Sequence, residues 1–111
     1  MITTHVLDTS LGQPAAGVKV SLEVLTAGSG WTQVAWGTTD ADGRVRELLP
    51  DPYLSERRYR LVFDTATYFG ERGVAAFYPV VIVVFEIADP QQHYHVPLLL
   101  SPFGYSTYRG S

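Results

Sequence analysis

The sequence predicts an all-β sandwich interrupted by one short helix. Turn-forming residues recur at short intervals, in the segments 12–14, 28–30, 40–43, 50–52, 89–90 and 101–104. The runs between these turns are rich in Val, Leu, Thr, Tyr and Phe, which favour extended strands. Many short strands separated by regular turn signals are typical of an antiparallel sandwich or barrel.

Strict alternation of apolar and polar residues marks the clearest strand. Four apolar positions, Val18, Val20, Leu22 and Val24, are separated by Lys19, Ser21 and Glu23. Side chains on a strand point alternately to its two faces, so this pattern predicts a half-buried strand. Residues 31–36 are its expected hairpin partner. Further strands are expected at residues 4–7, 45–48, 59–63, 80–87, 94–100 and 105–108.

Residues 64–73 break the strand pattern and predict the helix. The segment begins with Asp64, a good N-cap, and ends with Gly73, a residue typical of helix C-termini. Gly70 weakens this interpretation, because glycine inside a helix costs about 1 kcal/mol relative to alanine.

The apolar residues 80–84 give a first indication of an oligomer. This run is nearly all β-branched, a composition typical of strands covered on both faces. One face would pack on the opposite sheet. The second face would need the helix or another subunit.

Length and composition narrow the classes of function. The chain has 111 residues, 46% hydrophobic and 17% charged, which fits one globular domain over residues 1–111. It has no cysteine for a disulfide or a thiolate metal site. A net charge of −3, with Lys19 as the only lysine, makes nucleic acid an unexpected partner. The N-terminus lacks a signal-peptide pattern and the apolar runs are too short to span a membrane, so we expect a cytoplasmic protein.

Strand parity picks out three candidate functional residues. His5, Arg44 and His95 each directly precede a valine. Since neighbouring residues on a strand face opposite ways, valines that face the core would place all three polar side chains outward. Pro97 and Leu99 share the outward row of the His95 strand. Their apolar character indicates cover by another subunit, where a groove could collect two imidazoles and a guanidinium.

Taken singly, each of these residues has a simpler interpretation. His5 alone would be a surface residue, and Arg44 alone would be a solvated arginine of the hairpin turn at residues 40–44. His93 and His95 are spaced to bind a metal on one strand face, but no third ligand is evident, so a metal-free role is preferred and His93 is assigned to the surface. The sequence has no Ser-His-Asp order, phosphate loop or catalytic carboxylate pair.

Several segments together resemble the transthyretin-like family from end to end. They are residues 5–8 (HVLD), 12–15 (GQPA), 18–22, 40–44 (DADGR), 95–102 (HVPLLLSP) and 105–111 (YSTYRGS). The terminal Tyr-Arg-Gly-Ser is the most specific piece. It resembles the ending of the 5-hydroxyisourate hydrolase branch and is unlike the tail of the hormone carrier.

The resemblance implies two four-stranded antiparallel sheets with one short helix, assembled as a homotetramer (a dimer of dimers) with a central channel. It implies hydrolysis of 5-hydroxyisourate, a purine-derived intermediate of urate degradation, without metal or cofactor. The catalytic residues it implies are His5, Arg44 and His95. The substrate contacts it implies are His5, Arg44, Tyr108, Arg109, Gly110 and Ser111.

Two other classes of function stay open on the sequence alone. The first is a transthyretin-like carrier for a small aromatic ligand, without catalysis. The histidines and the terminal tetrapeptide disfavour it. The second is a sandwich module that mediates interactions within a larger protein. Extra domains or linkers would be its natural sign, and the 111 residues contain neither.

Overall fold

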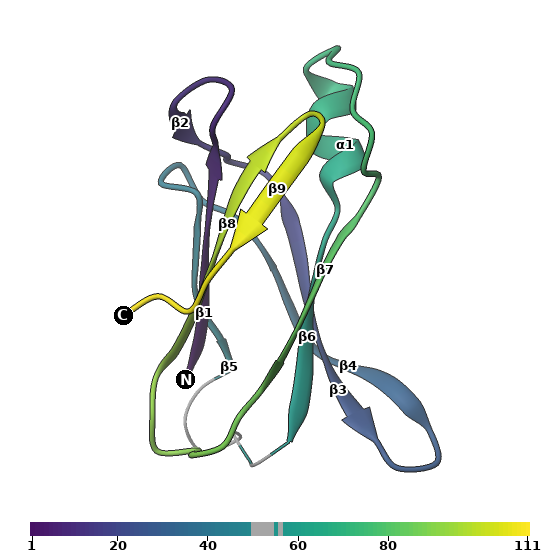
Figure 1. Cartoon of the computed structure of the whole chain (residues 1–111), viewed down its shortest axis with the longest axis vertical. Coiled ribbons are helices and arrows are strands. Elements are labelled where there is room, and N and C mark those ends of the chain that lie inside the picture. The colour runs from purple at the N-terminus through teal and green to yellow at the C-terminus, as the bar shows by residue number, and fades with distance from the viewer. Residues whose placement is uncertain (50–54, 56) are drawn as a thin grey trace.

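Two β-sheets pack face to face in the computed structural model, which describes residues 1–49, 55 and 57–111 (Figure 1). Figure 1 places β1, β8 and β9 in one layer and β3, β6 and β7 in the other, with α1 at one end. The core between them contains fully buried side chains from both sheets, including Ile2, Val6, Val20, Leu22, Leu61, Phe63 and Leu98. The predicted sandwich is confirmed.

The first sheet is built around the pair of β1 (Ile2–Asp8) and β8 (Tyr94–Ser101). These two strands run parallel, whereas the expected sheets were antiparallel throughout. No hairpin joins β1 to β8, because almost the whole chain lies between them, so their relative direction was not constrained locally. On its far side β8 pairs with β9 (Gly104–Thr107).

Two short partners share the free edge of β1. The first half of β1 pairs with β5 (Arg44–Leu49), and its end pairs with the two-residue strand β2 (Gln13–Pro14). Among the described residues, the first sheet therefore has five strands, where four were expected. β2 and β5 follow one another along the same edge of β1. A two-residue strand that includes proline carries no periodic signal, which is why β2 was missed.

The second sheet has the expected four antiparallel strands. Its order is β4 (Gly30–Thr38), β3 (Lys19–Thr26), β6 (Arg58–Phe63) and β7 (Val81–Glu86). The alternation predicted for β3 is confirmed, since Val20, Leu22 and Val24 are buried and the residues between them are not. The expected turn at residues 50–52 lies outside the described residues.

β7 departs from the expectation that both of its faces would be covered. Val81 is fully buried, but Ile82 and Val84 on the other face are 44% and 52% exposed. β7 is also an edge strand, and the helix lies near the end of the sandwich rather than over this face (Figure 1). Within one chain, this apolar face is open to solvent.

The helix α1 (Thr65–Glu71) is the only helix among the described residues, and it lies inside the predicted segment. The Asp64 side chain accepts a hydrogen bond from the main-chain N–H of Thr67, as expected of an N-cap. Gly73 adopts a φ of +67° just beyond the helix, where glycine avoids the strain of other residues. At seven residues, α1 is too short to cross a bilayer, and no other helix in the described part of the chain could do so.

A buried polar contact ties α1 to the first sheet. The hydroxyl of Tyr68 donates to Oδ2 of Asp8 at 2.7 Å, and both side chains are about 2% exposed. The hydroxyl and main-chain N–H of Ser10 donate to Oδ1 of the same carboxylate. Every Asp8 oxygen is thus satisfied, which removes the penalty of burying an unpaired charge.

Candidate active site

The three polar residues His5, Arg44 and His95 face outward from the first sheet, as their strand positions predicted. The valines that follow them, Val6, Val45 and Val96, all pack against the core. His5, Arg44 and His95 consequently lie on the outer face of the first sheet, on three different strands. Strand register brings them close together, since His5 is the partner of Arg44 in the β1–β5 ladder and Thr3 is the partner of His95 in the β1–β8 ladder.

The turn before β5 fixes where Arg44 starts its strand. Oδ1 of Asp40 accepts hydrogen bonds from the main-chain N–H groups of Asp42 and Arg44. Gly43 has a φ of +75°, and a Cβ there would lie 2.3 Å from the carbonyl oxygen of Val6, so only glycine fits. The acids of this turn pair with Arg46 rather than with Arg44. Arg44 is therefore placed by the backbone of the turn.

Arg44 and His95 face a shared hollow of about 220 Å³. Its lining also includes Thr3, Arg46, His93 and the C-terminal Ser111. His5 does not line this hollow, although it is close enough for its charge to affect His95. Four polar residues that line the hollow were not among the predicted site residues: Thr3, Thr4, Arg46 and His93.

Burial lowers the pKa of His95 below the ordinary histidine value. The positive charges of Arg44, His93 and His5 lower it further, in that order, and a hydrogen bond with the main chain of Thr3 partly opposes them. His95 is therefore held as a neutral imidazole at neutral pH, which is the form that can accept a proton.

The C-terminal tail is fastened over His95. The main-chain N–H of Gly110 donates to the carbonyl oxygen of His95 at 2.8 Å. The tail also covers Pro97, because a Cβ on Gly110 would lie 3.2 Å from Cγ of Pro97. Cover of the outward row had been expected from another subunit. Pro97 is buried by its own chain instead, while Leu99 in the same row is half-buried.

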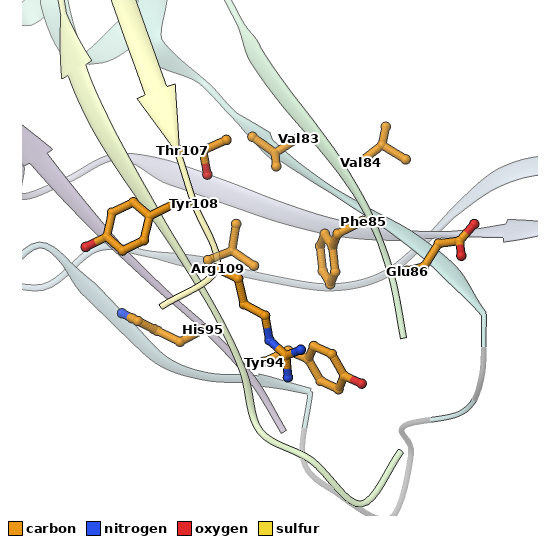
Figure 2. A pocket seen from close by; sticks show the side chains of 10 residues that line it. Val83, Val84, Phe85, Glu86, Tyr94, His95, Thr107, Tyr108 and Arg109 are labelled. Carbon is orange, nitrogen blue, oxygen red and sulfur yellow. The ribbon is translucent and has the colours of Figure 1, made fainter. Parts of the chain in front are cut away.

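Tyr108 and Arg109 line a different hollow, together with residues of β7. In Figure 2 the Tyr108 ring itself points away from β7. The Arg109 guanidinium donates to Oε1 of Gln92 at 2.8 Å and lies 4.6 Å from the ring centre of Tyr94. Figure 2 shows the Arg109 guanidinium beside the Tyr94 ring, with His95 at the margin of the same hollow. Of the predicted tail contacts, only Ser111 shares the hollow of Arg44, and His95 borders both hollows.

A metal ligand set was also sought around the histidine pair. In the described ranges, no three His, Cys, Asp or Glu side chains come together in a way that could hold a metal ion. The rings of His93 and His95 instead meet at the hydroxyl of Thr3, with Nε2 of His93 at 3.0 Å and Nδ1 of His95 at 2.8 Å.

The two sheets, the single helix and the polar residues on the outer face define a transthyretin-like sandwich. The structure matches transthyretin from sea bream in complex with thyroxine with a TM-score of 0.92 and 39% identity, covering 98% of this chain and 93% of that one. It matches 5-hydroxyisourate hydrolase from Klebsiella pneumoniae with a TM-score of 0.85 and 37% identity, covering 99% and 98%.

The sequence comparisons assign the family. Residues 2–110 match the model of the HIUase/Transthyretin family, and the chain belongs to that family. A 5-hydroxyisourate hydrolase of Salmonella dublin is 46% identical over 111 residues, which are all of this chain and 81% of that protein. A 5-hydroxyisourate hydrolase of Mus musculus is 48% identical, covering 99% of this chain and 94% of that protein.

Proposed function

We propose that this chain hydrolyses 5-hydroxyisourate to 2-oxo-4-hydroxy-4-carboxy-5-ureidoimidazoline, with His5, Arg44 and His95 as its catalytic residues. The hydrolase relatives support the reaction, since their identity extends over the whole chain. The fold alone does not separate enzyme from carrier, because both kinds of structure match it. The observation that carries the proposal is the neutral His95 beside Arg44 in one hollow.

The reaction adds water to an activated cyclic amide and breaks its C–N bond. It needs a base for the water, a positive group for the oxygen that becomes negative, and a proton for the leaving nitrogen. A neutral imidazole can take the proton from water. The Arg44 guanidinium stays charged at every relevant pH and offers a planar set of donors to the developing oxyanion.

Because His5 and His95 lie on the same face of the first sheet, one imidazole can take the proton from water and the other can deliver a proton to the leaving nitrogen. We assign the base to His95, because the pKa of this residue is lowered and its ring is held by Thr3. His5, the register partner of Arg44, is then the group that orients the substrate or delivers the proton to the leaving nitrogen. This division of roles needs no metal or cofactor.

The tail completes the substrate site in this proposal. Ser111 faces the hollow, and the Gly110 backbone lies against the His95 ring. Tyr108 is 58% exposed, so its ring can turn toward a flat substrate once one is bound. Arg109 would contribute through its main chain or after leaving Gln92.

We infer that the working form is a homotetramer, a dimer of dimers. A hollow of about 220 Å³ is small beside the roughly 300–1,000 Å³ of typical ligand pockets, so a second copy would supply the missing walls. The exposed apolar residues Ile82, Val84, Leu11 and Phe103 offer surface for such contacts. Solution mass measured by light scattering tests this, and a monomer at assay concentration would refute it.

The cytoplasm is the proposed place of action. The chain has no cysteine, so its fold needs no oxidising compartment. Fractionation of the native cells with an antibody would test this, and recovery outside the cytoplasmic fraction would contradict it.

The proposed reaction is tested by the ultraviolet absorbance of freshly generated 5-hydroxyisourate, with and without the protein. Catalysis predicts faster decay that scales with protein concentration. A carrier without catalysis predicts a decay rate that stays the same or falls, together with saturable binding of a small aromatic ligand. Unaccelerated decay would therefore overturn the proposed function.

A further inference from the structure

Thr3 joins two imidazole rings on the outer face of the first sheet. Its hydroxyl oxygen lies 2.8 Å from Nδ1 of His95 and 3.0 Å from Nε2 of His93. The two ring centres are 6.3 Å apart. A hydroxyl has one hydrogen to donate, so Thr3 can donate to one ring only and accepts from the other.

This arrangement couples the tautomers of the two histidines. If His95 carries its hydrogen on Nδ1, it donates to Thr3, and Thr3 donates to the bare Nε2 of His93. The reverse direction would place a hydrogen on Nε2 of both rings. The hydrogen-bond distances fit both, but only the first leaves Nε2 of His95 with a free lone pair.

The surroundings of His95 favour the first direction. A hydrogen bond with the main chain of Thr3 raises the pKa of His95, which is the effect of an acceptor on a ring N–H. Nδ1 is the ring nitrogen within hydrogen-bond distance of Thr3, so we assign the hydrogen to Nδ1. In the described part of the chain, Nε2 of His95 makes no hydrogen bond, and His95 borders the hollow that contains Arg44.

We propose that His93 and Thr3 act as positioning residues that hold His95 in the Nδ1–H tautomer, with Nε2 presented to the substrate as the base. His93 acts only through Thr3 in this scheme. The inference rests on the proposed function for its role in turnover, although the tautomer itself is a property of the free protein.

The backbone places the three residues of this relay side by side. Thr3 is the register partner of His95 in the β1–β8 ladder and is only 8% exposed. His93 directly precedes β8, and the next residue, Tyr94, donates from its main chain to the carbonyl oxygen of Met1 at 2.9 Å. Thr3 and His95 therefore start from paired strand positions, whereas His93 is exposed and is placed by the main-chain bond of its neighbour Tyr94.

Matched pairs of variants separate the hydrogen bond from packing. Thr3→Val removes the hydroxyl at nearly the same size, whereas Thr3→Ser keeps it. His93→Phe keeps a flat ring without an acceptor, whereas His93→Gln keeps a neutral acceptor in its side-chain oxygen. We expect Thr3→Val and His93→Phe to lower kcat about 10-fold, within the 10²–10⁴-fold that a general base contributes in total, with little change in KM. Thr3→Ser and His93→Gln should recover most of that loss.

The ¹⁵N spectrum of the imidazole rings provides a readout that packing alone would not move. Above the pKa of His95, the wild-type protein should show the Nδ1–H tautomer, and Thr3→Val should shift the ring toward Nε2–H. An Nε2–H tautomer in the wild type would overturn the inference, and so would wild-type kcat in both Thr3→Val and His93→Phe. Wild-type protein without any ring-opening activity would instead overturn the proposed function, whatever the tautomer.

Discussion

Gly110 lies so close to His95 that a Cβ at position 110 would sit 2.6 Å from Cδ2 of the imidazole ring. The same residue donates its main-chain N–H to the carbonyl oxygen of His95. The tail therefore packs against the ring and limits its movement. A glycine at position 110 follows from this contact, because any side chain would have to displace the ring or the tail.

Gly110→Ala should reduce turnover with little loss of stability. The added methyl group would push His95 or the tail aside, and a misplacement of about 1 Å can cost roughly 10²-fold in rate. Initial rates of 5-hydroxyisourate decay would measure this. Gly70→Ala is the matched control, because a Cβ there meets nothing within 4 Å. It should leave turnover unchanged and add about 0.5–1 kcal/mol to the free energy of unfolding. Full activity in Gly110→Ala would mean that the ring is not held by the tail.

The acid limb of the activity profile should lie below the ordinary histidine pKa. Burial and the charge of Arg44 lower the pKa of His95, so the base stays neutral until the pH falls further than usual. Arg44→Gln removes one of the charges that repel the proton. The pKa of His95 then rises, and the acid limb of kcat/KM moves to higher pH while its plateau falls. An acid limb that does not move would place the titrating base elsewhere.

Tyr68→Phe should destabilise the fold by about 1.5–3 kcal/mol, the usual value for a hydrogen bond to a charged group. The Asp8 carboxylate would remain buried with one donor fewer. Burial by itself raises the pKa of Asp8, but hydrogen bonds from Ser10, Tyr68 and Leu11 outweigh it and lower the pKa. Denaturant unfolding at neutral pH would measure the loss, with Tyr105→Phe as an exposed control that changes little.

The direction in which stability changes with pH follows from the pKa shifts of Asp8 and Tyr68. A lowered folded-state pKa means that Asp8 stabilises the fold above its unfolded pKa and loses this contribution as the pH falls through the folded value. Burial and the hydrogen bond to Asp8 raise the pKa of Tyr68 to about 12, so its contribution is lost only as the pH rises toward that value. Tyr68→Phe should therefore weaken the acid dependence of stability. An equal loss at every pH would exclude this linkage.

The fold was predictable from local patterns, with the exceptions of pairing and of one short strand. Alternation along β3 and capping by Asp64 both act within a few residues, so the sequence alone could indicate them. The parallel direction of β1 and β8 joins segments about 90 residues apart, and no local signal encodes it. The exposure of the apolar side chains of Ile82 and Val84 was likewise not predictable, because an all-apolar run is typical of a strand covered on both faces.

For the site, the alternation of side chains along each strand predicted which residues face outward. It did not predict which of them contact one another. It placed His5, Arg44 and His95 together because each precedes a valine. It could not find Thr3, because the role of Thr3 depends on the β1–β8 register. The assignment of His93 to the surface is confirmed, since His93 is exposed, but its hydrogen bond with Thr3 could not be predicted from local sequence. The family resemblance singled out the tail, whose position over His95 is fixed by the Gly110–His95 hydrogen bond and by the contacts of Arg109 with Gln92 and Tyr94.

His95 and Arg44 are the two residues proposed to perform the hydrolysis. The most direct test measures kcat/KM for 5-hydroxyisourate in His95→Asn and Arg44→Ala, with Arg57→Ala as the control, since Arg57 is exposed and bonds only to Thr26 among the described side chains. We predict that each site variant loses at least ~10²-fold while keeping wild-type stability, and that the control keeps full activity. Near-normal turnover in folded His95→Asn and Arg44→Ala would contradict the proposed site.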